Sequence, residues 1–198
     1  MRGTLISRTW EWNPALYAPA RYRRACKYEA FLPDRVRGID FTLAASVAGA
    51  VSEAEKAIHT LNAIAQPALQ PLARLLLRTE AIASSKVEGM QVGIRQIARA
   101  ESRMETGGRM APTVLEVLGN IDAMQLAIED AAISDRLRLE HLSDIHRRLM
   151  ANAPNSHLAG VIRTDQNWIG GNDYNPCGAD FVPPPPEHVG NLLSDLCE

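Results

Sequence analysis

The sequence has few aromatic residues and no excess of charge of either sign. Aromatic side chains make up 5% of its 198 residues, which is low for a β-sandwich but suits a helical bundle packed with Leu, Ile and Ala. Lys and Arg number 21 and Asp and Glu number 23, for a net charge of -2. We therefore expect neither a nucleic acid nor an anionic membrane as the main partner. The apolar runs are far shorter than a membrane span.

Cysteine is also scarce. Cys26, Cys177 and Cys197 are far apart and odd in number, a pattern that suits a reducing cytosol better than a disulfide framework. The N-terminus has no signal-peptide apolar region, because Arg8 and Glu11 interrupt it. These features predict a cytoplasmic protein without disulfides.

A self-sufficient catalytic or metal site is missing from the sequence. The five histidines are His59, His141, His146, His157 and His188. They form no metal-ligand pattern such as His-Glu-x-x-His, and there is no Gly-x-Ser-x-Gly elbow. Gly170-Gly171 is not followed by Lys-Ser/Thr and so is not a phosphate loop. We expect no metal to bind to this chain.

Helical periodicity dominates the middle of the chain. Apolar residues recur at intervals of three and four, which predicts helices. The predicted helices cover residues 40–64, 72–88, 94–104, 113–128 and 139–150, with a last helix from residue 187. Thr113 and Glu116 are expected to form a capping box at the start of the fourth helix. The last helix reaches Glu198 without a stop signal, so we expect that the chain has been cut short.

The two remaining regions are rich in turn-forming residues. Residues 1–38 are interrupted by prolines and predict an irregular arm. Residues 153–186 contain many Gly, Asn, Asp and Pro residues, with short β-like runs at 168–169 and 181–182. The second region predicts a hairpin that stands off the helical body.

The hexapeptide Ser-Ser-Lys-Val-Glu-Gly at residues 84–89 closes the second helix. Gly89 can adopt the left-handed conformation that ends a helix, which would hold the carboxylate of Glu88 in a fixed place. A carboxylate held in this way can pair with a cation, such as an arginine that would otherwise bind phosphate.

Three separated motifs resemble those of one known family. Residues 162–171 (Ile-Arg-Thr-Asp-Gln-Asn-Trp-Ile-Gly-Gly), followed by Phe-Val and four prolines at 181–186, resemble the flap of Fic-family proteins, the protein adenylyltransferases. Residues 77–89 resemble the inhibitory helix of the same family, whose pattern Ser/Thr-x-x-x-Glu-Gly/Asn maps onto Ser84, Glu88 and Gly89. Residues 116–118 and 140–150 look like its scaffold helices. The resemblance runs in order from about Tyr28 to the last residue.

The resemblance implies an all-α fold, a Fic-type helical bundle with a β-hairpin flap. It implies an N-terminal arm at 1–38 and a Fic N-terminal region at 39–110, with the inhibitory helix at about 72–89. Residues 111–198 would be the first part of the Fic domain, with the flap at about 158–186. The family's catalytic motif, His-Pro-Phe-x-Asp/Glu-Gly-Asn-Gly-Arg, is absent from the sequence, so we expect a truncated chain that is inactive alone.

The resemblance also implies an activity for the complete protein, the transfer of AMP from ATP to a protein hydroxyl, with ATP and Mg as cofactors. Glu88 would inhibit this activity by pairing with an active-site arginine, with Ser84 steadying the helix and Gly89 ending it. A target protein would dock on the flap. The docking residues would be Gln166, Asn167, Trp168, Ile169, Gly170, Gly171, Phe181 and Val182.

Three interpretations compete. The first is the regulatory and target-docking portion of an adenylyltransferase. The second is a non-catalytic binding module that inhibits a Fic partner in trans, although such an inhibitor would not need the scaffold helices and the flap. The third, a plain helical interaction protein, does not explain the ordered motifs. Exposed apolar faces on the fifth and last helices would favour a homo-oligomer.

Overall fold

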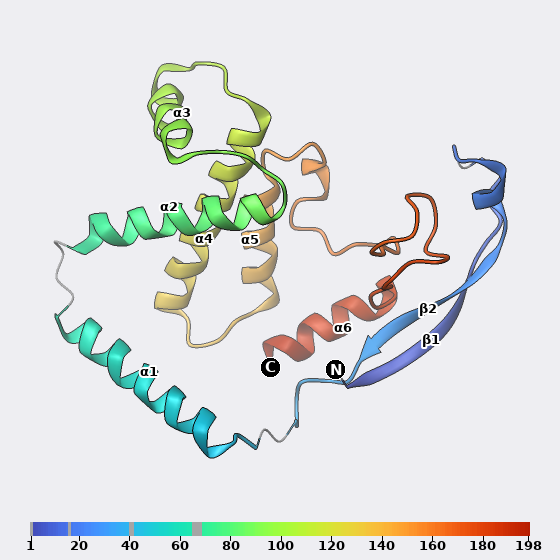
Figure 1. Ribbon diagram of the computed structural model, residues 1–198, viewed down its shortest axis with the longest axis horizontal. Helices are drawn as coiled ribbons and strands as arrows, with labels where there is room; N and C mark the ends of the chain where they lie inside the picture. The colour runs from blue at the N-terminus through green and yellow to red at the C-terminus, as the bar shows by residue number, and fades with distance from the viewer. Residues whose placement is uncertain (1, 16, 40–41, 65–68) are drawn as a thin grey trace. The chain divides into compact units, whose positions relative to one another are not determined.

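The computed structural model describes residues 2–15, 17–39, 42–64 and 69–198. The chain divides into two compact units. The terminal unit contains Met1–Ile39 and Val161–Glu198, and the central unit contains Asp40–Gly160. Figure 1 follows their elements in chain order. The domain boundaries predicted after residues 38 and 110 stay predictions.

The central unit is helical. Its elements are α1 (Ala45–Ile64), α2 (Gln70–Val87), α3 (Ile94–Thr106), α4 (Pro112–Ile133), α5 (Leu139–Met150) and the short 3₁₀ helix η3 (Ser156–Leu158). The five helices predicted for this region are confirmed, although Asp40, the predicted first residue of α1, lies outside the described residues. None of the described helices is long and apolar enough to cross a membrane.

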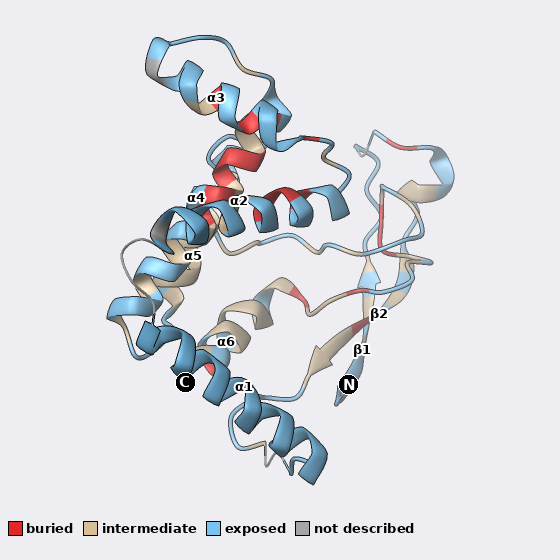
Figure 2. Ribbon diagram, turned by 60° about the vertical axis from the view of Figure 1, so that its left-hand side comes forward, coloured by how far each residue is buried: buried red, intermediate tan, exposed pale blue. Residues whose placement is uncertain are grey.

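Helices α2, α3 and α4 share one hydrophobic core, coloured red in Figure 2. Its fully buried centre contains Ala81 from α2, Ile97 from α3 and Val117 from α4. Burying side chains of this kind contributes about 1.5–3 kcal/mol each for the larger ones. The core therefore fixes the C-terminal half of α2, which leads to the predicted inhibitory motif.

A polar contact joins α4 to the last turns of α2. The side-chain amide of Asn120 donates hydrogen bonds to the backbone oxygen of Ala81, at 3.2 Å, and to Oγ of Ser85, at 3.1 Å. Ser85 is only 1% exposed, so its hydroxyl depends on this partner, because a buried polar group without a hydrogen bond is costly. Asn120 thus fixes both the rotation of α2 and its position along α4.

The capping box predicted at the start of α4 is wrong. The helix begins at Pro112, Ala111 is its N-cap, and no side chain caps it. Proline suits this first helical position because its φ is already helical and the missing N–H would have no partner there. Thr113 therefore lies inside the first turn, where its side chain cannot act as the cap.

Helix α1 carries its predicted apolar stripe on an exposed surface. The apolar residues that predicted this helix are between 46% and 64% exposed: Val47, Val51, Ile58, Leu61 and Ile64 in α1, and Leu43 just before it. No described residue of α1 is buried, so the periodicity predicted the helix correctly without predicting burial. The start of α2 is similar, because Leu72, Leu75 and Leu76 are also exposed.

The terminal unit holds a two-stranded antiparallel sheet and a helix. Strand β1 (Gly3–Trp10) pairs with β2 (Cys26–Pro33), with Gly3 opposite Pro33 and Trp10 opposite Cys26. A 3₁₀ helix, η1 (Ala20–Arg23), lies in their connection, and α6 (Pro186–Cys197) ends the unit. Among the described residues the chain is thus mostly helical with a small antiparallel hairpin, which confirms the predicted fold class.

The expectation of an irregular N-terminal arm is wrong. The prolines that suggested it, Pro14 and Pro19, lie in the connection, and Pro33 lies at the end of β2. Strand β2 is also bonded to residues far along the chain, since the amide of Phe31 donates to the backbone oxygen of Val182 at 2.8 Å. Such long-range pairing stabilises a strand but leaves no local sequence signal.

Replacing Asn120 by Ala should lower the free energy of unfolding by about 1–3 kcal/mol, because the buried Ser85 hydroxyl loses its partner. Urea unfolding followed by circular dichroism measures this change. Gln125→Ala is the matched control, because Gln125 lies on the same helix and bonds only to the exposed Glu129. Equal effects of the two substitutions would show that the Asn120 contact does not stabilise the unit.

Candidate functional site

Two backbone hydrogen bonds close the C-terminal end of α2. The amide of Gly89 donates to the backbone oxygen of Lys86, and that of Met90 to the oxygen of Ser85, both at 3.0 Å. Gly89 has a φ of +84°, the left-handed conformation of a Schellman motif. The predicted glycine stop is confirmed, and Glu88 lies at the C-cap with φ -85° and ψ 11°.

Ser84 and Glu88 of the motif lie on a solvent-exposed side of α2. Ser84 and Glu88 are four residues apart and are both exposed, so they share one face of the helix end. Glu88 takes part in none of the ion pairs found among the described residues. Its carboxylate is therefore available to a cation that approaches this face.

Sequence reasoning missed the residues that hold this helix end in place. Ser85, not Ser84, is the buried serine, and it bonds to Asn120. One signal for this contact is present in the sequence, because Asn120 lies between the core residues Leu118 and Ile121 of α4. A polar side chain among core positions usually has a specific hydrogen-bond partner.

The predicted flap contains a single β-bridge. Ile169 pairs with Phe181: the amide of Ile169 donates to the oxygen of Phe181, and the amide of Asp180 donates to the oxygen of Ile169, both at 2.8 Å. The next residue, Val182, is bonded on the other side to β2 through Phe31. One backbone hydrogen bond thus links the flap to β2, while the Ile169–Phe181 bridge stays separate from the two-stranded sheet.

This pairing limits how the flap can bind an extended segment. The backbone N–H and C=O groups of Ile169 are engaged by residues 180–181, so a docked strand would have to use the neighbouring Trp168 and Gly170. The side chain of Ile169 is 64% exposed and remains free to contact a partner. Val182, by contrast, is buried and supports the flap from inside.

The tip of the flap is held by asparagine and tryptophan side chains. The indole N–H of Trp168 donates to the oxygen of Asn172 at 2.6 Å. Oδ1 of Asn172 accepts from the amides of Tyr174 and Asn175, at 2.9 and 3.0 Å. Gly170 is required here, because a Cβ at this position would lie 1.9 Å from Oδ2 of Asp180 and its φ is +75°. The flap is therefore a defined loop.

Aromatic pairs and a disulfide join the flap to the N-terminal hairpin. The rings of Tyr22 and Tyr174 stack at 5.2 Å, and those of Trp10 and Trp168 meet edge-on at 5.8 Å. Cys26 and Cys177 form a disulfide with their Cα atoms 6.3 Å apart. The expectation of no disulfide is wrong for this pair, because pairing of β2 with the flap brings together two cysteines that are distant in sequence.

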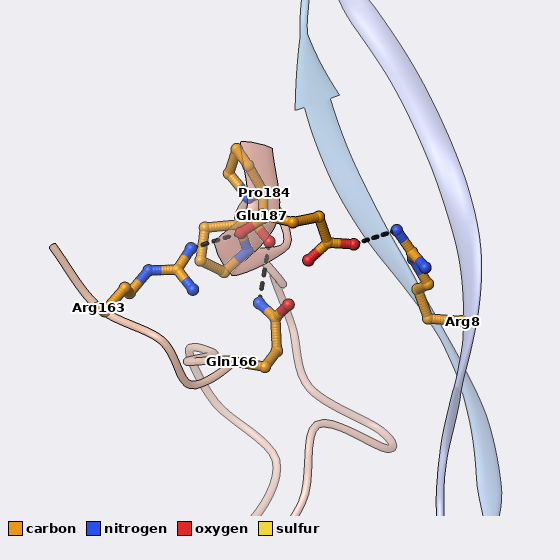
Figure 3. A network of polar contacts seen from close by, with 6 residues as sticks. Arg8, Arg163, Gln166, Pro184 and Glu187 are labelled. Carbon is orange, nitrogen blue, oxygen red and sulfur yellow. Dashed lines mark hydrogen bonds and ion pairs between the residues drawn. The ribbon is translucent and has the colours of Figure 1, made fainter. Parts of the chain in front are cut away.

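A polar network surrounds the two ends of the flap (Figure 3). Arg8 of β1 forms an ion pair with Glu187 at the start of α6. Arg163 donates to the oxygens of Asp165, at 2.8 Å, and Pro184, and the side-chain amide of Gln166 donates to the oxygen of Pro183 at 3.0 Å. Gln166 therefore ties the flap to its polyproline exit.

Burial shifts two pKa values in this network. Burial lowers the pKa of Arg163, and the negative charge of Glu187 opposes the shift; the guanidinium stays charged because arginine does not lose its proton in proteins. Burial raises the pKa of Tyr28, Arg8 opposes the shift, and Glu187 adds to it. Tyr28 is therefore neutral and can donate a hydrogen bond at ordinary pH.

One segment of the central unit is similar to a known family. Residues 48–129 match the family model described as the Fic/DOC family N-terminal region. The match contains α2 and α3 and most of α1 and α4, and so includes Ser84, Glu88 and Gly89. This segment is therefore similar to the N-terminal region of Fic/DOC proteins. No curated protein matches the chain.

The Fic match and the flap lie in different parts of the chain. The match ends at residue 129, so it does not include the flap residues Gln166 to Gly171, Phe181 and Val182. Among the residues that the structure describes, no group of three or more His, Cys, Asp or Glu side chains could hold a metal ion. The roles of the inhibitory and docking residues stay predictions.

Gly89→Ala should destabilise the protein by about 1–2 kcal/mol, because alanine is strained in the left-handed conformation. A Cβ at Gly89 meets no atom within 4 Å, so the effect would be conformational and not steric. Gly89→Asn is the control, since asparagine tolerates this conformation better. If Ala and Asn lower the urea midpoint equally, the left-handed stop is not the cause.

Cys177→Ser should lower the free energy of unfolding by about 2–5 kcal/mol under oxidising conditions, because the disulfide closes a long loop. Cys197→Ser is the matched control, since Cys197 is a free thiol, and it should change stability little. Urea unfolding with and without dithiothreitol measures both effects. A wild-type midpoint that dithiothreitol leaves unchanged would contradict a stabilising disulfide.

Proposed function

We propose that this chain is the N-terminal regulatory and target-docking portion of a Fic-type protein adenylyltransferase, inhibited by Glu88. The complete protein would transfer AMP from ATP to a hydroxyl group of a target protein. The observation that carries the proposal is the position of Glu88. It is an exposed carboxylate at a defined helix end, inside the segment that matches the Fic/DOC family N-terminal model.

The residues present do not fit ATP or Mg. The sequence has no glycine-rich phosphate loop and lacks the catalytic motif of the family. The described residues provide no cluster of carboxylates for a divalent ion. Both cofactors would bind through residues that this sequence does not contain, and AMP transfer would depend on those residues.

This chain would hold a carboxylate in position to pair with an arginine that otherwise binds ATP phosphate. The Asn120 contacts fix the last turns of α2 against α4, and the Schellman motif fixes the backbone around Glu88. A guanidinium that approaches Glu88 would gain charge-assisted hydrogen bonds. An arginine held in this way could not at the same time bind a phosphate group of ATP.

A second candidate function is inhibition of a separate Fic partner in trans. Two observations favour it: the catalytic motif is absent from these 198 residues, and Glu88 is exposed. The two candidates differ in which polypeptide supplies the arginine. Adding the 198-residue chain to a purified Fic enzyme that lacks its own inhibitory helix separates them, because only the second predicts inhibition by wild type and none by Glu88→Gly.

Partners and location follow from the same proposal. The target protein would dock on the flap through the exposed Ile169 side chain and the backbone beside it. Self-association of the chain is also proposed, through exposed apolar residues such as those of α1. We place the protein in the cytoplasm, although the disulfide between Cys26 and Cys177 stands against this location, since cytosolic thiols are usually reduced.

In the complete protein, Glu88→Gly should raise auto-adenylylation at least about tenfold, because the arginine that Glu88 would hold becomes free to bind ATP. Incorporation of labelled AMP from ATP measures the change. Glu80→Gln is the matched control, since Glu80 is another exposed acid of α2, two turns before Glu88. Equal incorporation in wild type and Glu88→Gly would exclude the inhibitory role.

A further inference from the structure

One groove of the terminal unit includes the proposed docking residues Phe181 and Val182 but extends beyond the flap to the β1–β2 hairpin. It has a volume of about 400 Å³ and lies between the β1–β2 hairpin and flap residues 176–182. Its lining includes apolar side chains from both hairpin and flap, together with carboxylates. These residues include Leu5, Glu29, Phe31, Asp180, Phe181 and Val182.

The walls of the groove are held together by covalent and main-chain contacts. The amide of Phe31 bonds to the oxygen of Val182 at 2.8 Å, and the rings of Phe31 and Phe181 lie 6.2 Å apart. The disulfide between Cys26 and Cys177 links β2 to the flap at the residue between Pro176 and Gly178, which both line the groove. The groove is therefore preformed, which lowers the entropy cost of binding.

Two carboxylates give the groove its charge. Glu29 and Asp180 are both exposed, and neither takes part in an ion pair among the described residues. Asp180 has a defined position, since its amide bonds to Ile169 and its carboxylate lies against Gly170. A ligand with a positive charge would complement these acids.

The apolar part of the groove is open to a partner. Leu5 is 63% exposed and Phe181 39% exposed, although each is large and apolar. Apolar surface in a groove with a charged margin is typical of a site that accepts one apolar side chain of a bound polypeptide.

We infer that this groove binds an extended segment of a partner protein in which an apolar residue has Lys or Arg neighbours. The apolar side chain would enter between Leu5 and Phe181, and the cationic neighbours would pair with Glu29 and Asp180. The inference rests on the proposed function in one respect, that the partner is the target docked on the flap. Binding itself needs neither ATP nor the catalytic motif.

The test is fluorescence anisotropy of the 198-residue chain with a labelled Gly/Ser peptide that carries a central Leu between Arg residues. Binding should weaken at least about tenfold when the Leu is replaced by Ser, since its burial is lost. Replacing the Arg residues with Glu should abolish binding, because like charges would then face each other. A peptide with Glu that binds as well as the Arg peptide would overturn the inference.

Variants of the protein locate the binding site. Leu5→Ser should weaken binding of the Leu/Arg peptide at least about fivefold, and Glu29→Gln should weaken it about threefold and reduce its salt dependence. Both residues are exposed, so the fold should persist, which circular dichroism checks. Glu11→Gln is the control, since Glu11 is an exposed acid of the same unit that does not line the groove.

Other outcomes would contradict the inference or separate it from the proposed inhibition. No binding at up to about 1 mM protein, or binding that neither Leu5→Ser nor Glu29→Gln weakens, would overturn it. A dimer of the chain that dissociates in Leu5→Ser would also overturn it, because a second copy would then be the occupant. Peptide binding together with unchanged adenylylation in Glu88→Gly would support the groove while contradicting the proposed inhibition.

Discussion

The position of Glu88 depends on the hydrogen bonds from Asn120 to the last turns of α2. They fix the rotation of α2, and with it the side of the helix on which Ser84 and Glu88 lie. The apolar core of α2, α3 and α4 supplies most of the stability, but apolar packing is non-directional and tolerates small rotations. A polar contact with a defined geometry prevents these rotations. Such a fixed helix position is needed if the Glu88 carboxylate is to meet one arginine.

The terminal unit uses a different kind of constraint. Its hairpin and flap bury little apolar surface, and they are joined by a disulfide, aromatic pairs and backbone bonds. Small units with modest cores commonly depend on such links. The flap is thus supported by residues of the N-terminal hairpin, which would contribute to the proposed docking surface.

Local patterns in the sequence predicted the helices and the stop at Gly89, because helical periodicity and a glycine C-cap act within a few residues. They did not predict strands β1 and β2, which pair across the connection that contains η1, or the disulfide between Cys26 and Cys177, which joins β2 to the flap. They also could not show that Ser85 and not Ser84 is buried, since this depends on how α4 packs. The predicted inhibitory role of Glu88 came from a sequence motif, and the structure adds the contacts that hold the end of α2 in place.

The most direct test of the account is a crystal structure, without nucleotide, of the complete adenylyltransferase that we propose. The account predicts that a carboxylate oxygen of Glu88 lies within about 4 Å of an arginine guanidinium in the nucleotide site, with Asn120 still bonded to Ser85. A Glu88 side chain that points into solvent, away from any arginine, would contradict it.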